Sequence, residues 1–188
     1  MLKGKTALVT GSTSGIGLGI AKALAADHEV VVADTTQRGH ATRLARDAGD
    51  PLPALQWLIY PVTDLRGGSR SRTLLANGFL LTKHDMDWFT GQYVGGSGLE
   101  VTDPRISPLL AADFAGVSPA LVVTAGFDPL RDEGEQYVAK LRDAGVPVDH
   151  RRMGSMIHAF LNLNALGGGV ARANAEMISA LRAHLARV

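Results

Sequence analysis

Short apolar runs alternate with amphipathic stretches along most of the chain. Five apolar runs have the length of a strand and end at glycine, proline or polar residues: Thr6–Thr10, Glu29–Ala33, Leu55–Tyr60, Ala120–Thr124 and the more polar Val148–Met153. Apolar residues recur at helical spacing in the segments 16–26, 38–48, 82–93, 133–144 and 170–187. Strands that alternate with helices predict an α/β fold, a doubly wound and mostly parallel sheet with helices on both faces. We therefore expect three layers and a sheet of about five strands, with Val148–Met153 at an edge.

The region between residues 64 and 108 departs from this alternation. Residues 67–72 form a polar run rich in glycine, serine and arginine, which predicts a loop. The helix expected after it places Met86, Phe89 and Tyr93 on one apolar face.

Composition narrows the class of protein. The 188 residues are 46% hydrophobic and 20% charged, with a net charge of +1, which is typical of a soluble globular protein. This charge offers no electrostatic argument for a nucleic-acid partner. Without cysteine the chain forms no disulfide or thiolate metal site, and we expect no metal. No apolar run has the roughly 18 residues needed for a membrane span, and no signal-like segment follows Met1, so a cytoplasmic location is expected.

A glycine-rich turn lies between the first strand and the first helix. Its sequence is TGSTSGIG at residues 10–17, where glycines allow a pyrophosphate to approach the helix N-terminus. Asp34 ends the second strand about 20 residues further on, where a carboxylate can bind an adenosine ribose. The candidate cofactor-binding residues are Gly11, Ser12, Gly15, Ile16, Gly17 and Asp34. The alternative is that the glycines only form a tight turn between strand and helix.

The segment from Lys3 to about Gly49 resembles the start of a short-chain dehydrogenase/reductase. The resemblance implies a Rossmann-like βαβα unit over residues 1–49 and weak binding of NAD, which Asp34 would favour over NADP. The family's catalytic tyrosine is followed four residues later by lysine, and no tyrosine of this chain has that neighbour. A working dehydrogenase is therefore not expected.

Four segments in the rest of the chain resemble, in order, motifs of the hormone-sensitive-lipase type of esterase. They are LIYPVTD at 58–64, DPRISPL at 103–109, TAGFDPLRDEG at 124–134 and MIHAF at 156–160, the last usually with glycine in place of Ala159. The resemblance identifies residues 50–188 as the C-terminal half of a truncated α/β-hydrolase, which together with residues 1–49 is expected to form one compact domain. It implies a small-molecule acyl ester as substrate and no required cofactor.

Asp128 and His158 are the candidate acid and histidine of a Ser-His-Asp triad. Asp128 follows a strand, so its carboxylate is expected at the carboxyl edge of the sheet, where open α/β folds place their sites. His158 follows the last strand near the same edge, and the order of acid and then histidine is that of α/β-hydrolases. The alternatives are a carboxylate that caps the next helix and an ordinary loop histidine. Asp132 is expected to cap or ion-pair, and the other histidines are expected at the surface: His28, His40, His84, His150 and His184.

The sequence lacks the remaining parts of an esterase site. It contains neither a G-x-S-x-G nucleophile turn nor an H-G-G-G-type oxyanion loop. Thr35 falls at the nucleophile position after Asp34, but β-branched threonine tolerates a strained turn poorly. Thr13 is a second surrogate, one βα unit too early. We expect weak or no ester hydrolysis. The alternatives are an NAD-binding module and a non-functional chimera. Association of the chain into a homo-oligomer is also considered.

Overall fold

The computed structural model describes residues 6–10, 29–33 and 38–187. Its largest sheet is parallel, with the order β3-β4-β5 and the bounds Gln56–Ile59, Ala120–Phe127 and Val148–Ile157. A second parallel pair consists of β1 (Thr6–Thr10) and β2 (Glu29–Ala33). All five expected strands are therefore present.

The expectation of a single five-stranded sheet is corrected by the strand pairing. Among the described strands, β1 and β2 hydrogen-bond to each other, while β3 pairs only with β4. Apolar runs predict that a segment is extended, but backbone hydrogen bonds between segments decide which strands share a sheet. The glycine turn and the helix expected at 16–26 lie outside the described residues, so the described part does not establish a Rossmann unit.

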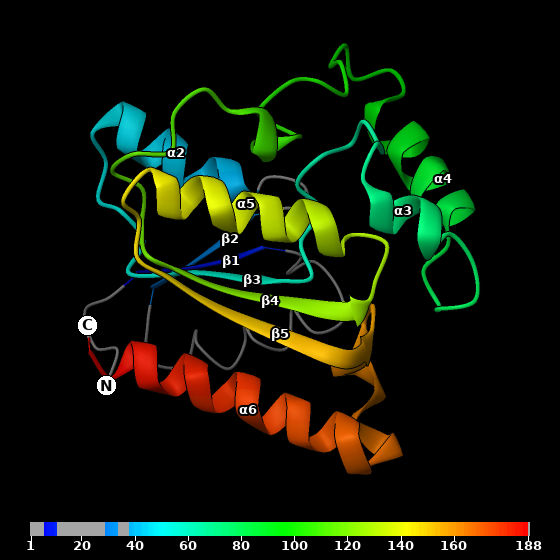
Figure 1. Cartoon of the computed structure of the whole chain (residues 1–188). Coiled ribbons are helices and arrows are strands. Elements are labelled where there is room, and N and C mark those ends of the chain that lie inside the picture. Colours follow the sequence, from blue (N-terminus) through cyan, green and yellow to red (C-terminus); the bar gives the residue numbers. More distant parts are fainter. Residues whose placement is uncertain (1–5, 11–28, 34–37, 188) are drawn as a thin grey trace.

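Helices cover both faces of the larger sheet (Figure 1). On one side lie α2 (Arg38–Ala48) and α5 (Arg131–Asp143), and α6 (Gly168–Leu185) lies on the other. In Figure 1, α3 (Arg70–Leu74) and α4 (Lys83–Val94) lie on the same side of this sheet as α5, toward the carboxyl end of β4. The expected three layers are thus observed around the three-stranded sheet. None of the helices in the described part is both long and apolar enough to cross a membrane.

Strand β4 explains why there are two apolar layers. Successive side chains of a strand point to opposite faces, and the neighbours Val122 and Val123 are both fully buried. Val122 packs in a cluster with Tyr137 and Leu141 of α5, whereas Val123 packs in a second cluster with Met177 of α6. A central parallel strand is covered on both faces, which accounts for the almost continuous apolar sequence of β4.

One other expectation is corrected between residues 64 and 108. Instead of a continuous loop over 67–72, the chain forms the short helix α3, where Ser69 accepts a hydrogen bond from the backbone of Arg72. On α4, Met86 of the predicted apolar face is buried, whereas Phe89 of the same face is 58% exposed. Helical spacing places side chains on one face and does not determine how much of that face another element covers.

Candidate active site

Asp128 lies directly after β4, in the turn that leads into α5. Its side chain is 1% exposed, and both carboxylate oxygens accept hydrogen bonds. Oδ1 accepts from the backbone N–H of Leu130 at 2.8 Å, and Oδ2 lies 2.8 Å from Nδ1 of His158. Leu130 is the N-cap residue of α5 and no side chain caps this helix, so the capping role considered as an alternative is not observed. The hydrogen bond to Leu130 instead closes the turn that leads into α5.

His158 follows β5 and is 30 residues from Asp128 in the sequence. Because a carboxylate only accepts, the contact places the hydrogen on Nδ1, which donates to Asp128 and leaves a lone pair on Nε2. The His158 side chain is 20% exposed. The expected juxtaposition of Asp128 and His158 at the carboxyl edge of the sheet is observed, and their catalytic role stays a prediction.

The backbone on each side of this contact adopts conformations that position the imidazole. Tyr60, directly after β3, has a φ of 36°, and its ring centroid lies 4.6 Å from that of His158. Phe160 packs edge-on against Tyr60 with centroids 5.7 Å apart. Ala159 has a φ of 60° and precedes the 3-10 helix Phe160–Leu166. Non-glycine residues rarely adopt positive φ, so the packing around His158 compensates for the local strain.

Gly126 allows the end of β4 to lie close to β5. A Cβ atom at this position would lie 1.9 Å from the carbonyl oxygen of Gly154, so no other residue fits without moving the backbone. The pairing register of β4 and β5 also shifts between Ala125 and Phe127. Such irregularities redirect the following side chains, and here the next residue is Asp128.

A polar network lies beside the site, between the loop after β3, α3 and α5. Arg72 and Glu133 form an ion pair of 2.8 Å, and their side chains are only 5% and 2% exposed. Glu133 also accepts from the backbone N–H groups of Thr63 and Asp64. Burial raises the pKa of Glu133, and Arg72 with the two backbone donors partly offsets this rise.

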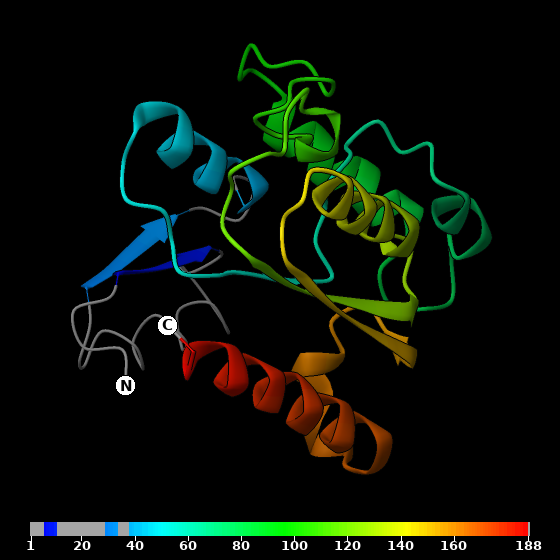
Figure 2. The same cartoon turned by 60° about the vertical axis from the view of Figure 1, so that its left-hand side comes forward.

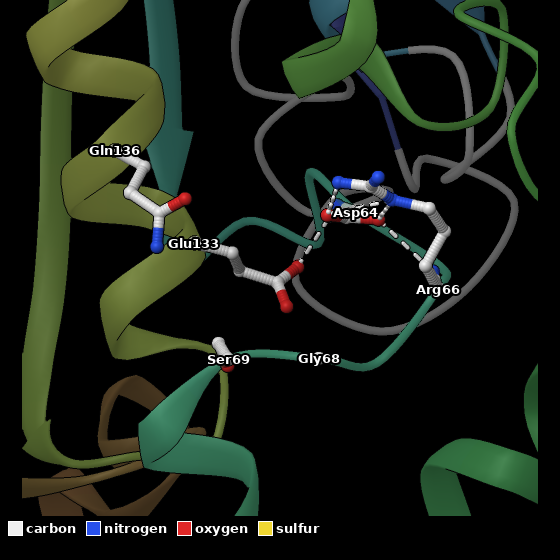
Figure 3. Close-up of a pocket in the computed structure, with 6 residues that line it drawn as sticks. All are labelled: Asp64, Arg66, Gly68, Ser69, Glu133 and Gln136. Atoms are coloured by element: carbon white, nitrogen blue, oxygen red, sulfur yellow. Dashed lines mark hydrogen bonds and ion pairs between the residues drawn. The ribbon is translucent and has the colours of Figure 1, made fainter.

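A cavity of about 280 Å³ opens at this network. Figure 3 shows Asp64, Arg66 and Glu133 in its wall, with Ser69 and Gln136 at the side of α3 and α5. Burial raises the pKa of Asp64, but hydrogen bonds from Arg66 lower it by more, so the net pKa lies below the usual value. The carboxylates facing this cavity are therefore already paired within the chain, and the network acts as a support for the loop after β3.

The remaining sequence predictions have different outcomes. Asp132 accepts from the backbone of Ser71 at 2.8 Å and pairs with Arg131, which confirms its expected structural role. His150 was expected at the surface, but it is half-buried and lies 2.9 Å from the hydroxyl of Thr124. The sequence around His150 has no motif that could indicate this contact.

Several candidate residues lie outside the described residues. They are the cofactor-binding candidates Gly11, Ser12, Gly15, Ile16, Gly17 and Asp34, and the nucleophile-position candidate Thr35. The described structure therefore tests neither the predicted cofactor site nor the position of a nucleophile. In the part of the chain that the structure describes, no three His, Asp or Glu side chains are grouped so that they could hold a metal ion.

A parallel sheet between helices, with an acid after one strand and a histidine after the next, is the arrangement of α/β-hydrolases. Residues 38–162 match the family described as alpha/beta hydrolase fold, and the chain belongs to this family. The match begins within the segment assigned above to the N-terminal unit, so it includes α2. The division of the chain near residue 50 stays a prediction.

Individual relatives are esterases. The chain is 58% identical over 144 residues to the carboxylic ester hydrolase LipN of Mycobacterium tuberculosis. This alignment covers 77% of this chain and 38% of LipN. The chain is 33% identical over 145 residues to an ethyl acetate hydrolase of Pseudomonas putida, which covers 77% of this chain and 45% of that protein. A thermostable esterase from Pseudomonas putida superposes with a TM-score of 0.73 at 36% identity, over 83% of this chain and 51% of that one. The chain thus spans about half or less of the length of these relatives. None of these similarities supports NAD binding.

Proposed function

We propose that the chain acts on small carboxylic esters, with Asp128 and His158 as its proton-transfer pair. The observation that carries this proposal is the 2.8 Å contact between Oδ2 of a buried aspartate and Nδ1 of a partly exposed histidine. Similarity to the carboxylic ester hydrolase LipN and to an ethyl acetate hydrolase supports the substrate class.

The pair is suited to general base and general acid catalysis. With Nδ1–H donating to Asp128, Nε2 of His158 can take a proton from an attacking hydroxyl and later donate it to the leaving alcohol. Asp128 would hold the ring in this tautomer and stabilise the imidazolium that forms.

We expect turnover to be low, because the sequence lacks G-x-S-x-G and an H-G-G-G-type loop. A triad without its nucleophile retains only the catalysis that comes from binding and oxyanion stabilisation. Thr35 is the residue at the nucleophile position, and its secondary hydroxyl is poorly suited to a strained turn.

The test is hydrolysis of p-nitrophenyl butyrate by the wild type, His158→Ala, Asp128→Asn, Thr35→Ala and Thr35→Ser. We expect a wild-type kcat well below about 1 s⁻¹, the lower end of ordinary enzymes. We also expect a further loss in His158→Ala and Asp128→Asn. Equal rates in the wild type and both of these variants would contradict a role for the pair. A rate in the ordinary enzyme range would contradict the low turnover, and a gain in Thr35→Ser would support the assigned nucleophile position.

A further inference from the structure

We propose that His158 is itself an acyl acceptor, whose Nε2 attacks activated esters and becomes transiently acylated. The ligand class is an ester with a good leaving group, such as an aryl acetate. This inference rests on the proposed function because it uses the same pair, but it assigns a different atom as the nucleophile.

The geometry leaves Nε2 as the reactive nitrogen. Nδ1 is committed to Asp128 at 2.8 Å, and Nε2 makes no hydrogen bond to any part of the chain that the structure describes. One fifth of the side chain is exposed, while Asp128 on the Nδ1 side is 1% exposed. Attack by Nε2 requires this exposed fifth of the side chain to include the ring edge away from Nδ1, where a substrate approaches.

The surroundings hold the ring in one orientation. Oδ1 of Asp128 is occupied by the backbone N–H of Leu130, so Oδ2 alone faces the imidazole. The ring of Tyr60 packs against the imidazole with ring centroids 4.6 Å apart, at an interplanar angle of 59°. A fixed tautomer and a restricted side chain lower the entropy lost in reaching the geometry of attack.

The reaction balances without a hydroxyl side chain. The Nε2 lone pair forms a bond to the carbonyl carbon, and collapse of the tetrahedral intermediate expels the aryl oxide. Asp128 stabilises the positive charge of the N-acyl ring. Water then adds to the acyl carbon and the bond to Nε2 breaks, which returns the neutral imidazole and releases a carboxylate and two protons. A good leaving group makes the missing oxyanion loop less important, because departure of the aryl oxide needs little help.

His184 offers a matched comparison within the same chain. Its side chain is 21% exposed and it also contacts a carboxylate, but through Nε2, which lies 3.1 Å from Oδ2 of Asp149. Asp149 is 26% exposed, so its charge acts in a more aqueous environment. The nitrogen left on His184 is Nδ1, which lies beside Cβ and is more hindered. The two histidines thus differ in the features that the proposal requires and agree in exposure.

The experiment treats the full chain with p-nitrophenyl acetate, quenches it in acid after short intervals and locates acetyl groups by peptide mass spectrometry. Diethyl pyrocarbonate, whose histidine adduct lasts longer, is the second reagent. We expect His158 to react faster than His184 by about tenfold, equivalent to about 1.4 kcal/mol in the barrier. Release of p-nitrophenol should fall in His158→Ala and Asp128→Asn and stay unchanged in His184→Ala. Circular dichroism checks the fold of each variant, and His158→Gln provides a second substitution.

The outcomes separate this inference from the proposed function. Equal modification of His158 and His184 overturns the inference. Hydrolysis that needs His158 but acetylates Thr35 or no residue overturns the inference and leaves the proposed function intact. Acetyl-His158 that accumulates without turnover supports Nε2 as the acyl acceptor but contradicts its hydrolysis, and it also contradicts the hydrolase function. If p-nitrophenol release does not depend on His158 and no adduct forms there, both proposals fail.

Discussion

Ala159 is the residue whose backbone directly follows His158, and its φ of 60° is costly for a residue with a Cβ atom. Glycine adopts this conformation freely, so we expect Ala159→Gly to raise the free energy of unfolding by about 0.5–1 kcal/mol. The measurement is urea unfolding followed by circular dichroism. Ala171→Gly, inside α6, is the control and should lower stability by about 1 kcal/mol. A loss of stability in both variants would show that Ala159 is not strained.

Tyr137 determines a second residue-scale property, the stability of the protein in alkali. Burial raises the pKa of Tyr137 to about 12, although nearby Arg43 lowers it in part. The unfolded chain releases this proton near pH 10 and the folded chain only near pH 12, so stability falls as pH rises between these values. The loss from Tyr137 amounts to roughly 2–3 kcal/mol. Tyr137→Phe should unfold with a shallower loss from pH 10 to 12 in urea titrations, and an unchanged slope would contradict this.

At the scale of elements, α3 depends on tertiary contacts because a five-residue helix is too short to be stable alone. The buried pair of Arg72 and Glu133 attaches it to α5. Replacing Arg72 by methionine leaves the carboxylate of Glu133 buried without its cation, and we expect a loss of about 3–5 kcal/mol in urea unfolding.

Two further variants test this explanation of α3. Arg70→Met changes an exposed arginine of the same helix and should alter stability by no more than about 0.5 kcal/mol. Arg72→Met combined with Glu133→Gln removes the unpaired charge but keeps an acceptor for the backbone of Thr63 and Asp64, so part of the loss should be recovered. Glu133→Gln alone is measured as well. If the loss of stability in the double variant equals the sum of the losses in Arg72→Met and Glu133→Gln, the ion pair is not the main contribution.

At the scale of the whole molecule, several large apolar side chains on α3, on α4 and at the end of β4 are exposed. They are Leu74 of α3, Leu80 between α3 and α4, Trp88 and Phe89 of α4, and Phe127 at the end of β4. Figures 1 and 2 show the ribbons of these elements. Phe127 also stacks on Phe79, with ring centroids 5.3 Å apart. Large exposed apolar patches favour association, so we expect the apparent mass to rise with concentration in multi-angle light scattering.

Substitutions test whether the exposed apolar side chains of α4 contribute more to self-association than an exposed apolar side chain elsewhere. Trp88→Gln with Phe89→Gln should reduce self-association. Leu166→Gln is the control, because Leu166 is 74% exposed but lies in the 3-10 helix before α6. A single monomeric mass at all concentrations, or equal effects of these variants, would count against this role of α4.

Local structure was readable from the sequence alone. The bounds of β1, β2 and α2 agree with the apolar periodicity, because strand and helix periods depend on neighbouring residues. The order of the Asp128 and His158 motifs likewise indicated the family and the edge of the sheet where they meet. Tertiary structure alone decided that β1 and β2 pair apart from β3, that Phe89 stays exposed and that Tyr60 packs on His158. Periodicity shows which face of an element is apolar, but the partner of that face is selected by packing between residues far apart in the chain.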